Sequence, residues 1–176
     1  VCEPPAISNP ARLTVIAKSL IITATGFDKV YDRNTSAIVS LQDNREAGAV
    51  FEVHHTAAKF DTWDVGINKP ILVEGIYLTG RDANNYSPNT TALTSADITP
   101  RPVVGTFTAA DKYYDGNTGA IITGRALLDV LAGDENGISL IGGIANFNDP
   151  NAANDKPVTS IDMTITGDRA FNYYLD

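Results

Sequence analysis

The chain has few of the side chains that enzymes use for catalysis. Its 176 residues include one cysteine, one methionine, one tryptophan and two histidines. The single Cys2 cannot form an internal disulfide or a cysteine-based zinc site. His54 and His55 have no third metal ligand at a recognisable spacing. Because no nucleophile or acid–base pair stands out either, the sequence predicts a protein that is not an enzyme and has no cofactor.

Positive charge and long apolar runs are also scarce. The 13 Lys and Arg residues against 21 Asp and Glu residues give a net charge of −8, with no basic cluster of the kind that binds nucleic acid. No segment approaches the ~20 continuous apolar residues of a membrane span. A chain with 43% hydrophobic and only 19% charged residues is nevertheless too apolar to be disordered. We therefore expect a folded protein with neither a nucleic-acid partner nor a membrane span.

The dominant feature of the sequence is an internal duplication. The segment DKVYDRNTSAIV at residues 28–39 recurs as DKYYDGNTGAII at residues 111–122, an offset of 83 with 8 of 12 positions identical. Further matches share an offset of 87: Phe60 with Phe147, Lys69-Pro70 with Lys156-Pro157, Gly80 with Gly167, and Asn85-Tyr86 with Asn172-Tyr173. The second copy therefore carries an insertion of 4 residues, opposite residues 39–60 of the first.

Both copies have the pattern of β-strands. Apolar and polar residues alternate over residues 20–24 and 158–165, and residues 71–80 are rich in β-branched and aromatic side chains. The one window with helical spacing of leucines, residues 124–136, falls in the inserted region of the second copy. We predict an all-β fold of two tandem Ig-like β-sandwich domains with antiparallel strands.

The predicted boundaries place an N-terminal strand or extension at residues 1–14, a first sandwich at 15–99 and a second at 100–176. Pro100 and Pro102 stiffen the link between the two sandwiches. After Asn85-Tyr86 the first copy continues into an apparent closing strand, whereas the second copy stops soon after Asn172-Tyr173. The second sandwich is therefore predicted to lack its closing strand.

The N-terminal stretch has the sequence position of that closing strand, because residues 7–18 lie opposite residues 90–101 at an offset of 83. Two explanations stay open. The chain is a fragment of a longer repeat array, or the N-terminal strand of one copy completes the second sandwich of its neighbour. In the second case the inward-facing side chains of the assembly strand are Ile7, Ala11, Leu13 and Val15.

The recurring block Lys-x-Tyr-Asp-x-Asn-Thr is predicted to form a turn between two strands, with its tyrosine ring buried and its Asp and Asn bonded to backbone amides. Its members are Lys29, Tyr31, Asp32 and Asn34, and then Lys112, Tyr114, Asp115 and Asn117. Arg33 of the first copy is the counterpart of Gly116 in the second, and a glycine at this position indicates a positive φ. Two chemical alternatives are calcium binding by clustered aspartates and a Lys–Asn isopeptide bond. Trp63, which has no aromatic counterpart in residues 148–154, is a candidate contact for a glycan or a protein.

These motifs resemble the YDG repeat, a relative of the mostly-β glycine-rich repeats. The resemblance rests on Lys29–Ala37 and Lys112–Ala120, on Gly80–Tyr86 and Gly167–Tyr173, and on a junction-like Ile98–Pro102. It covers nearly all of residues 15–176 and implies a secreted bacterial surface or adhesin protein without enzymatic activity. We therefore expect an extracellular structural protomer of a filament or adhesin stalk that assembles head to tail by donor-strand complementation. The alternative is a carbohydrate- or protein-binding module from a longer array.

Overall fold

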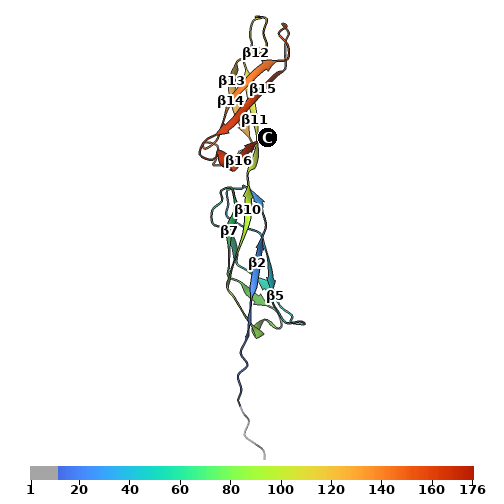
Figure 1. Cartoon of the computed structure of the whole chain (residues 1–176), viewed down its shortest axis with the longest axis vertical. Coiled ribbons are helices and arrows are strands. Elements are labelled where there is room, and N and C mark those ends of the chain that lie inside the picture. Colours follow the sequence, from blue (N-terminus) through green and yellow to red (C-terminus); the bar gives the residue numbers. More distant parts are fainter. Residues whose placement is uncertain (1–11) are drawn as a thin grey trace, which may run out of the picture.

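Two β-rich repeats follow one another along an elongated molecule (Figure 1). The structure is a computed structural model that describes residues 12–176. Repeat one contains β1 to β10 and repeat two contains β11 to β16. The two helical segments are single 3₁₀ turns at equivalent places, η1 (Ala83–Asn85) and η2 (Ala170–Asn172). The prediction of an all-β fold built from two repeated units is confirmed, and the Ig-like sandwich topology stays a prediction.

Repeat one is built around a four-stranded sheet of order β3-β10-β7-β6, with three two-stranded pairs, β1-β9, β2-β4 and β5-β8. Its strands are β1 (Lys18–Leu20), β2 (Ile22–Gly26), β3 (Lys29–Val30), β4 (Val39–Asp43), β5 (Glu52–His54), β6 (Ala57–Phe60), β7 (Gly66–Glu74), β8 (Tyr77–Thr79), β9 (Tyr86–Pro88) and β10 (Thr91–Thr99). The long strand β10 lies between β3 and β7 and closes the repeat.

Repeat two forms two three-stranded sheets of order β13-β11-β16 and β12-β14-β15. Its strands are β11 (Arg101–Ala109), β12 (Gly119–Ala120), β13 (Ile122–Leu128), β14 (Ser139–Phe147), β15 (Val158–Thr166) and β16 (Tyr173–Leu175). Only Pro100 separates β10 from β11, so one nearly continuous extended segment runs through both repeats (Figure 1).

The predicted antiparallel pairing holds for most strand pairs but not for all of them. Three strand pairs run parallel rather than antiparallel, namely β1-β9, β3-β10 and β11-β16. Each of these pairs joins strands that are distant in sequence, which gives the chain the long crossover that parallel pairing needs. The helix-like window at residues 124–136 forms the end of β13 and a series of turns, because β13 pairs with β11 along its length and this ladder outweighs local helix propensity.

The duplication is preserved in the strand register. In repeat one Lys18 of β1 lies opposite Tyr86 of β9, and in repeat two Arg101 of β11 lies opposite Tyr173 of β16. These partners are related by the same offsets of 83 and 87 that relate the two copies in the sequence. Equivalent residues can therefore be compared between the repeats.

The hydrophobic core is much fuller in repeat one. Its buried apolar residues are Leu20, Ile22, Tyr31, Phe51, Ala58, Phe60, Ile71, Val73, Ile76, Ala96 and Ile98, whereas repeat two buries Val103, Ile138, Leu140, Ala145 and Tyr173. Phe147 and Val158, the counterparts of the buried Phe60 and Ile71, are only half-buried. The difference arises because β10 covers this part of repeat one.

We predict that β10 stabilises repeat one through its inward face alone. Ile98→Ala should lower the free energy of unfolding by about 2–5 kcal/mol, because Ile98 is buried. Leu93→Ala on the same strand should change it by less than about 0.5 kcal/mol, because the Leu93 side chain is exposed. Urea unfolding followed by the fluorescence of Trp63 measures both. Equal costs for the two variants would contradict this account of β10.

Candidate functional site

A buried carboxylate joins the two repeats. Asp134, in the inserted loop of repeat two, is only 1% exposed, and its Oδ2 accepts hydrogen bonds of 2.8 Å from the hydroxyls of both Tyr31 and Tyr173. Tyr31 belongs to repeat one and Tyr173 to repeat two, and their rings meet edge to face with centroids 5.4 Å apart. One acceptor therefore holds a side chain from each side of the junction.

Arg33 adds a charge partner from repeat one. Its Nε lies 3.1 Å from Oδ1 of Asp134, and because this oxygen has no aligned hydrogen-bond donor, the contact is an ion pair. The guanidinium also donates to the carbonyl of Ala132 and covers Gly133, where a Cβ would collide with it. Arg33 has a left-handed backbone with φ 61°, which costs a non-glycine residue about 1–2 kcal/mol. Its contacts across the junction offset this strain.

A second set of bonds crosses the junction beside the first. The buried Asn172 accepts the backbone N–H of Val65 at 2.8 Å and donates to Oδ1 of Asp64 at 3.0 Å. Arg169 lies 3.5 Å from the same Asp64 oxygen. The buried apolar residues of repeat one also form one cluster with Val103, Ile138 and Tyr173 of repeat two, and the rings of Tyr31 and Tyr173 are in contact within it. Two sets of polar contacts and a shared apolar cluster thus join the two repeats.

The recurring motif forms a lysine-stapled turn in each repeat. The ammonium of Lys29 donates to Oδ1 of Asp32 at 2.7 Å and to the carbonyl oxygens of Asn34 and Ser36 at 2.7 and 3.1 Å. Lys112 repeats this arrangement with Asp115 and Asn117. The hydrogen bond from Lys112 is the largest cause of the lowered pKa of Asp115. These residues fix the turn from within.

The two tyrosines of the motif differ, which corrects the expectation that both rings are buried. Tyr31 is 0% exposed, but Tyr114 is 69% exposed. The reason is that the cover of Tyr31 comes from Asp134 and Tyr173 of the next repeat rather than from its own sheet. Tyr114 stands at the end of repeat two with no such cover within residues 12–176.

The structure does not support the two chemical alternatives for the motif. For the isopeptide bond, Nζ of Lys29 instead donates hydrogen bonds to surrounding oxygen acceptors, with Oδ1 of Asn34 at 3.2 Å as one of them. For calcium, no group of three acidic, His or Cys side chains converges in the part of the chain that the structure describes. Asp28 and Asp82 instead accept the backbone N–H groups of Asp97 and Val50.

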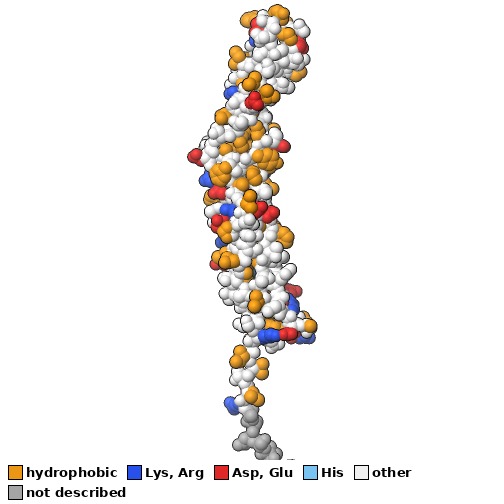
Figure 2. Space-filling view, in the orientation of Figure 1, with side chains coloured by type: hydrophobic (Ala, Val, Ile, Leu, Met, Phe, Trp, Pro, Cys, Tyr) orange, Lys and Arg blue, Asp and Glu red, His pale blue; other side chains and the backbone are white. Residues whose placement is uncertain are grey.

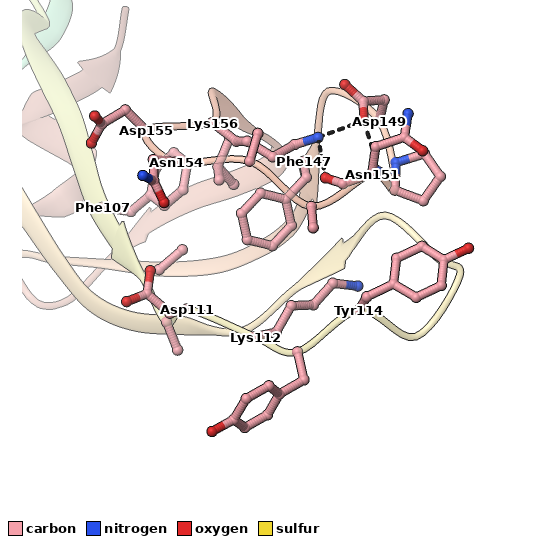
Figure 3. Close-up of a pocket in the computed structure, with 17 residues that line it drawn as sticks. Phe107, Asp111, Lys112, Tyr114, Phe147, Asp149, Asn151, Asn154, Asp155 and Lys156 are labelled. Carbon is pink, nitrogen blue, oxygen red and sulfur yellow. Dashed lines mark hydrogen bonds and ion pairs between the residues drawn. The ribbon is translucent and has the colours of Figure 1, made fainter.

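An open groove lies at the end of repeat two away from repeat one (Figures 1 and 3). It has a volume of about 1120 Å³, and Phe107, Phe147 and Val158 form part of its apolar wall. Its rim includes Lys112 and Lys156, the latter paired with Asp149. The equivalent space in repeat one lies between β3 and β7 and is filled by β10. Within residues 12–176, β15 pairs with β14 alone, so its other edge is open.

The N-terminal segment projects from the opposite end of the molecule (Figure 1). Residues 12–17 form no strand, and Figure 2 shows hydrophobic side chains along this projection. Leu13 is 91% and Val15 96% exposed. The other two predicted residues of the assembly strand, Ile7 and Ala11, lie outside the described residues.

Trp63 borders the junction. It is 39% exposed and precedes Asp64, which is bonded to Asn172. Its role as a ligand contact stays a prediction.

Sequence reasoning missed Asp134, Arg33 and Asn172 as junction residues. The available signals were the non-glycine residue at position 33 and the acid in the inserted loop.

The fold and the junction define a tandem-repeat β protein whose repeats are joined by a buried polar network. The family model of the YDG domain matches the chain twice, at residues 16–93 and 99–176. The chain therefore belongs to the YDG domain family. Neither a curated protein nor a solved structure matches it. Residues 12–176 contain no helix long and apolar enough to cross a membrane.

We predict that Asp134 couples the unfolding of the two repeats. Asp134→Ala removes the acceptor of two buried tyrosine hydroxyls and leaves Arg33 unpaired, which should cost about 3–5 kcal/mol. Calorimetry should show one transition for the unaltered chain and two for the variant. Asp168→Ala, at an exposed acid near η2, is the control and should keep the single transition. Identical melting of both variants would show that Asp134 does not couple the repeats.

The junction should also weaken in strong alkali. Burial, followed by the hydrogen bond to Asp134, raises the pKa of Tyr173 to about 12, and the same causes raise the pKa of Tyr31. A raised folded pKa gives stability that is complete below the unfolded pKa of about 10 and is lost as the pH rises from there through the folded pKa. The free energy of unfolding should fall between about pH 10 and 12, and less steeply in Tyr173→Phe. An unchanged slope in that variant would contradict the assignment.

Proposed function

We propose that this chain is a structural protomer of an extracellular filament or adhesin stalk, joined head to tail by donor-strand complementation. The supporting observation is that the place filled by β10 in repeat one is an open groove in repeat two. The N-terminal segment of a second copy would fill this groove. The role is structural and needs neither catalysis nor a cofactor. A bacterial cell-surface location is part of the proposal and follows from the resemblance of the motifs to repeats of secreted surface proteins.

The register of the N-terminal segment supports this assignment. At an offset of 83, Leu13 and Val15 take the positions of Ala96 and Ile98, the two buried residues of β10. The preceding Arg12 and the following Ile16 take the positions of Ser95 and Thr99, which are exposed. Leu13 and Val15, which are exposed on the single chain, thus match the inward face of the strand they would replace.

The groove supplies both kinds of interaction that a donated strand needs. The open edge of β15 offers backbone hydrogen-bonding groups, and Phe107, Phe147 and Val158 offer apolar surface. Burying Leu13 and Val15 contributes about 1.5–3 kcal/mol each. Donor and acceptor surfaces lie at opposite ends of the molecule (Figure 1), so the contact is head to tail and continues as a filament rather than closing into a dimer.

The rigid junction suits a stalk. A single proline separates β10 from β11, and the buried network around Asp134 ties the repeats together on both sides. A chain of such units keeps its direction over many repeats, unlike one joined by flexible linkers.

A second function is a binding module within a longer array, in which a following segment of the same polypeptide closes the groove. The partly exposed Trp63 beside the junction favours a glycan or protein contact there. The two functions differ in what the 176-residue chain does alone, because only strand donation between copies makes it polymerise.

We predict that polymerisation depends on the inward face of the N-terminal segment. The full chain should form filaments that are visible by electron microscopy and sediment rapidly, and deletion of residues 1–14 should leave monomers. Val15→Asp should also abolish assembly, because a carboxylate would be buried against the apolar part of the groove wall, Phe107, Phe147 and Val158. Ile16→Asp is the matched control, since it makes the same kind of change on the outward face, and it should still assemble. If the deletion variant polymerises like the full chain, strand donation is wrong.

A further inference from the structure

One residue of β10 is held by hydrogen bonds on both sides. Asp97 interrupts the register of β10 with β7, because the ladder shifts between Ala96 and Ile98. The backbone N–H of Asp97 donates to Oδ1 of Asp28 at 2.7 Å, and Oδ1 of Asp97 accepts the backbone N–H of Asn68 at 2.7 Å. Asp28 and Asn68 thus clamp the bulge residue of the strand that closes repeat one.

Repeat two retains both halves of this clamp. Asp111 is the counterpart of Asp28 at the offset of 83, and Asp155 is the counterpart of Asn68 at the offset of 87. The backbone of Asp155 is left-handed like that of Asn68, with φ 52° against 51°. Asp111 and Asp155 are both exposed and line the groove, where they stand on different walls (Figure 3). Within residues 12–176 the two halves of the clamp therefore have no strand between them.

We propose that Asp111 and Asp155 clamp Thr14 of a second copy and so fix the register of the donated strand. This inference rests on the proposed function. Thr14, which is exposed on the N-terminal projection, takes the position of Asp97 at the offset of 83. Its backbone N–H would donate to the carboxylate of Asp111, and its hydroxyl oxygen would accept the backbone N–H of Asp155. These two bonds replace those that hold Asp97 in repeat one.

The neighbours of β10 define where the donated strand lies. In repeat one β10 is parallel to β3 and antiparallel to β7, with Ser95 opposite Pro70. The same offsets place the donated strand parallel to residues 112–113 and antiparallel to the chain that enters β15, with Arg12 opposite Pro157. Arg12 and Pro157 are both exposed, so this pair would lie on the outer face of the completed sheet.

The apolar pattern of the donated strand does not by itself select this register. Because side chains alternate with a period of two, a slip of two residues leaves the same side chains facing inward. After one such slip Arg12 would lie opposite Thr159 instead of Pro157, and Thr14 would leave the clamp. A hydrogen bond to a charged acceptor is stronger than one between neutral groups, so the carboxylate of Asp111 favours the clamped register.

Disulfide cross-linking between copies reads this register directly. In a Cys2→Ser background, Arg12→Cys with Pro157→Cys should give covalent ladders when assembled filaments are oxidised with diamide. Opposite residues of an antiparallel pair lie about 4.5–5.5 Å apart at Cα, within reach of a disulfide. Arg12→Cys with Thr159→Cys is the matched control and should give about tenfold less product, because diagonal neighbours about 7–8 Å apart are too distant. A ladder from the Thr159 pair but not from the Pro157 pair would overturn the proposed register.

Asp111→Ala tests the clamp in the same two cysteine pairs. The substitution removes the charged acceptor for Thr14 and should let the strand slip, so that the Thr159 product rises about tenfold relative to the Pro157 product. Asp111→Asn keeps an acceptor oxygen and should retain most of the preference for Pro157. Asp168→Ala, at an exposed acid that does not line the groove, should leave the ratio unchanged.

The Asp155 half of the clamp is tested on the donated strand. Thr14→Val removes the hydroxyl that would accept the N–H of Asp155 and leaves the backbone bond to Asp111 in place. Because a hydrogen bond between neutral groups is weaker, the relative yield of the Thr159 product should rise by a smaller factor, about threefold. An unchanged ratio would show that Asp155 takes no part in the clamp.

The outcomes separate the clamp from strand donation. If Asp111→Ala still cross-links only through Pro157, strand donation stands and the clamp is wrong. If filaments form but neither cysteine pair cross-links, the proposed register is wrong. If the unaltered chain stays monomeric at all concentrations, both proposals fail. Circular dichroism of every variant confirms that the repeats are folded.

Discussion

The arrangement of the two repeats depends on one buried carboxylate. Asp134 accepts a hydrogen bond from a tyrosine hydroxyl of each repeat and pairs with Arg33, so its removal would leave two buried hydroxyls without their acceptor and Arg33 without its charge partner. The strained backbone of Arg33 and the bare Gly133 beneath its guanidinium make sense only in terms of this contact. The inserted loop of the second copy is thus an interface element, and its four extra residues give the two repeats different roles.

Similar residues behave differently in the two repeats because their surroundings differ. Phe60 and Phe147 end equivalent strands and lie near equivalent lysines, yet one is buried and the other borders a groove. Tyr31 and Tyr114 differ in the same way. In each pair the missing cover belongs to a neighbouring strand or repeat. Phe147 and Tyr114 of repeat two are therefore more exposed than their counterparts because the elements that cover Phe60 and Tyr31 have no equivalent there within residues 12–176.

The sequence was sufficient for the features that recur within it. The duplication predicted two equivalent units, and the alternation of side chains predicted strands. The glycine at position 116, the counterpart of Arg33, indicated a left-handed backbone, which both residues adopt. Parallel pairing of β1 with β9 could not be predicted, because the strands are short and their register depends on the path of the whole repeat. Leu127 and Leu128 have helical spacing with Leu131, but they lie in β13 because they pair with β11.

The junction residues were harder to predict because each functions through a partner far away in the sequence. Asp134 is 103 residues from Tyr31, and Asn172 is 107 from Val65. Within its own loop, Asp134 looks like an ordinary turn residue. The ring of Tyr31 was expected to be buried, and only the structure reveals that its hydrogen-bond acceptor and the ring against it come from the next repeat.

The near-continuous path of β10 into β11 also determines how the molecule would respond to mechanical load. Tension along the long axis passes from repeat to repeat through this segment and Pro100. The hydrogen bonds that join β10 to β7 and β11 to β13 lie across that direction. They are therefore loaded in shear, so that many must rupture together rather than one after another, and the protein would resist pulling far better than its modest core suggests.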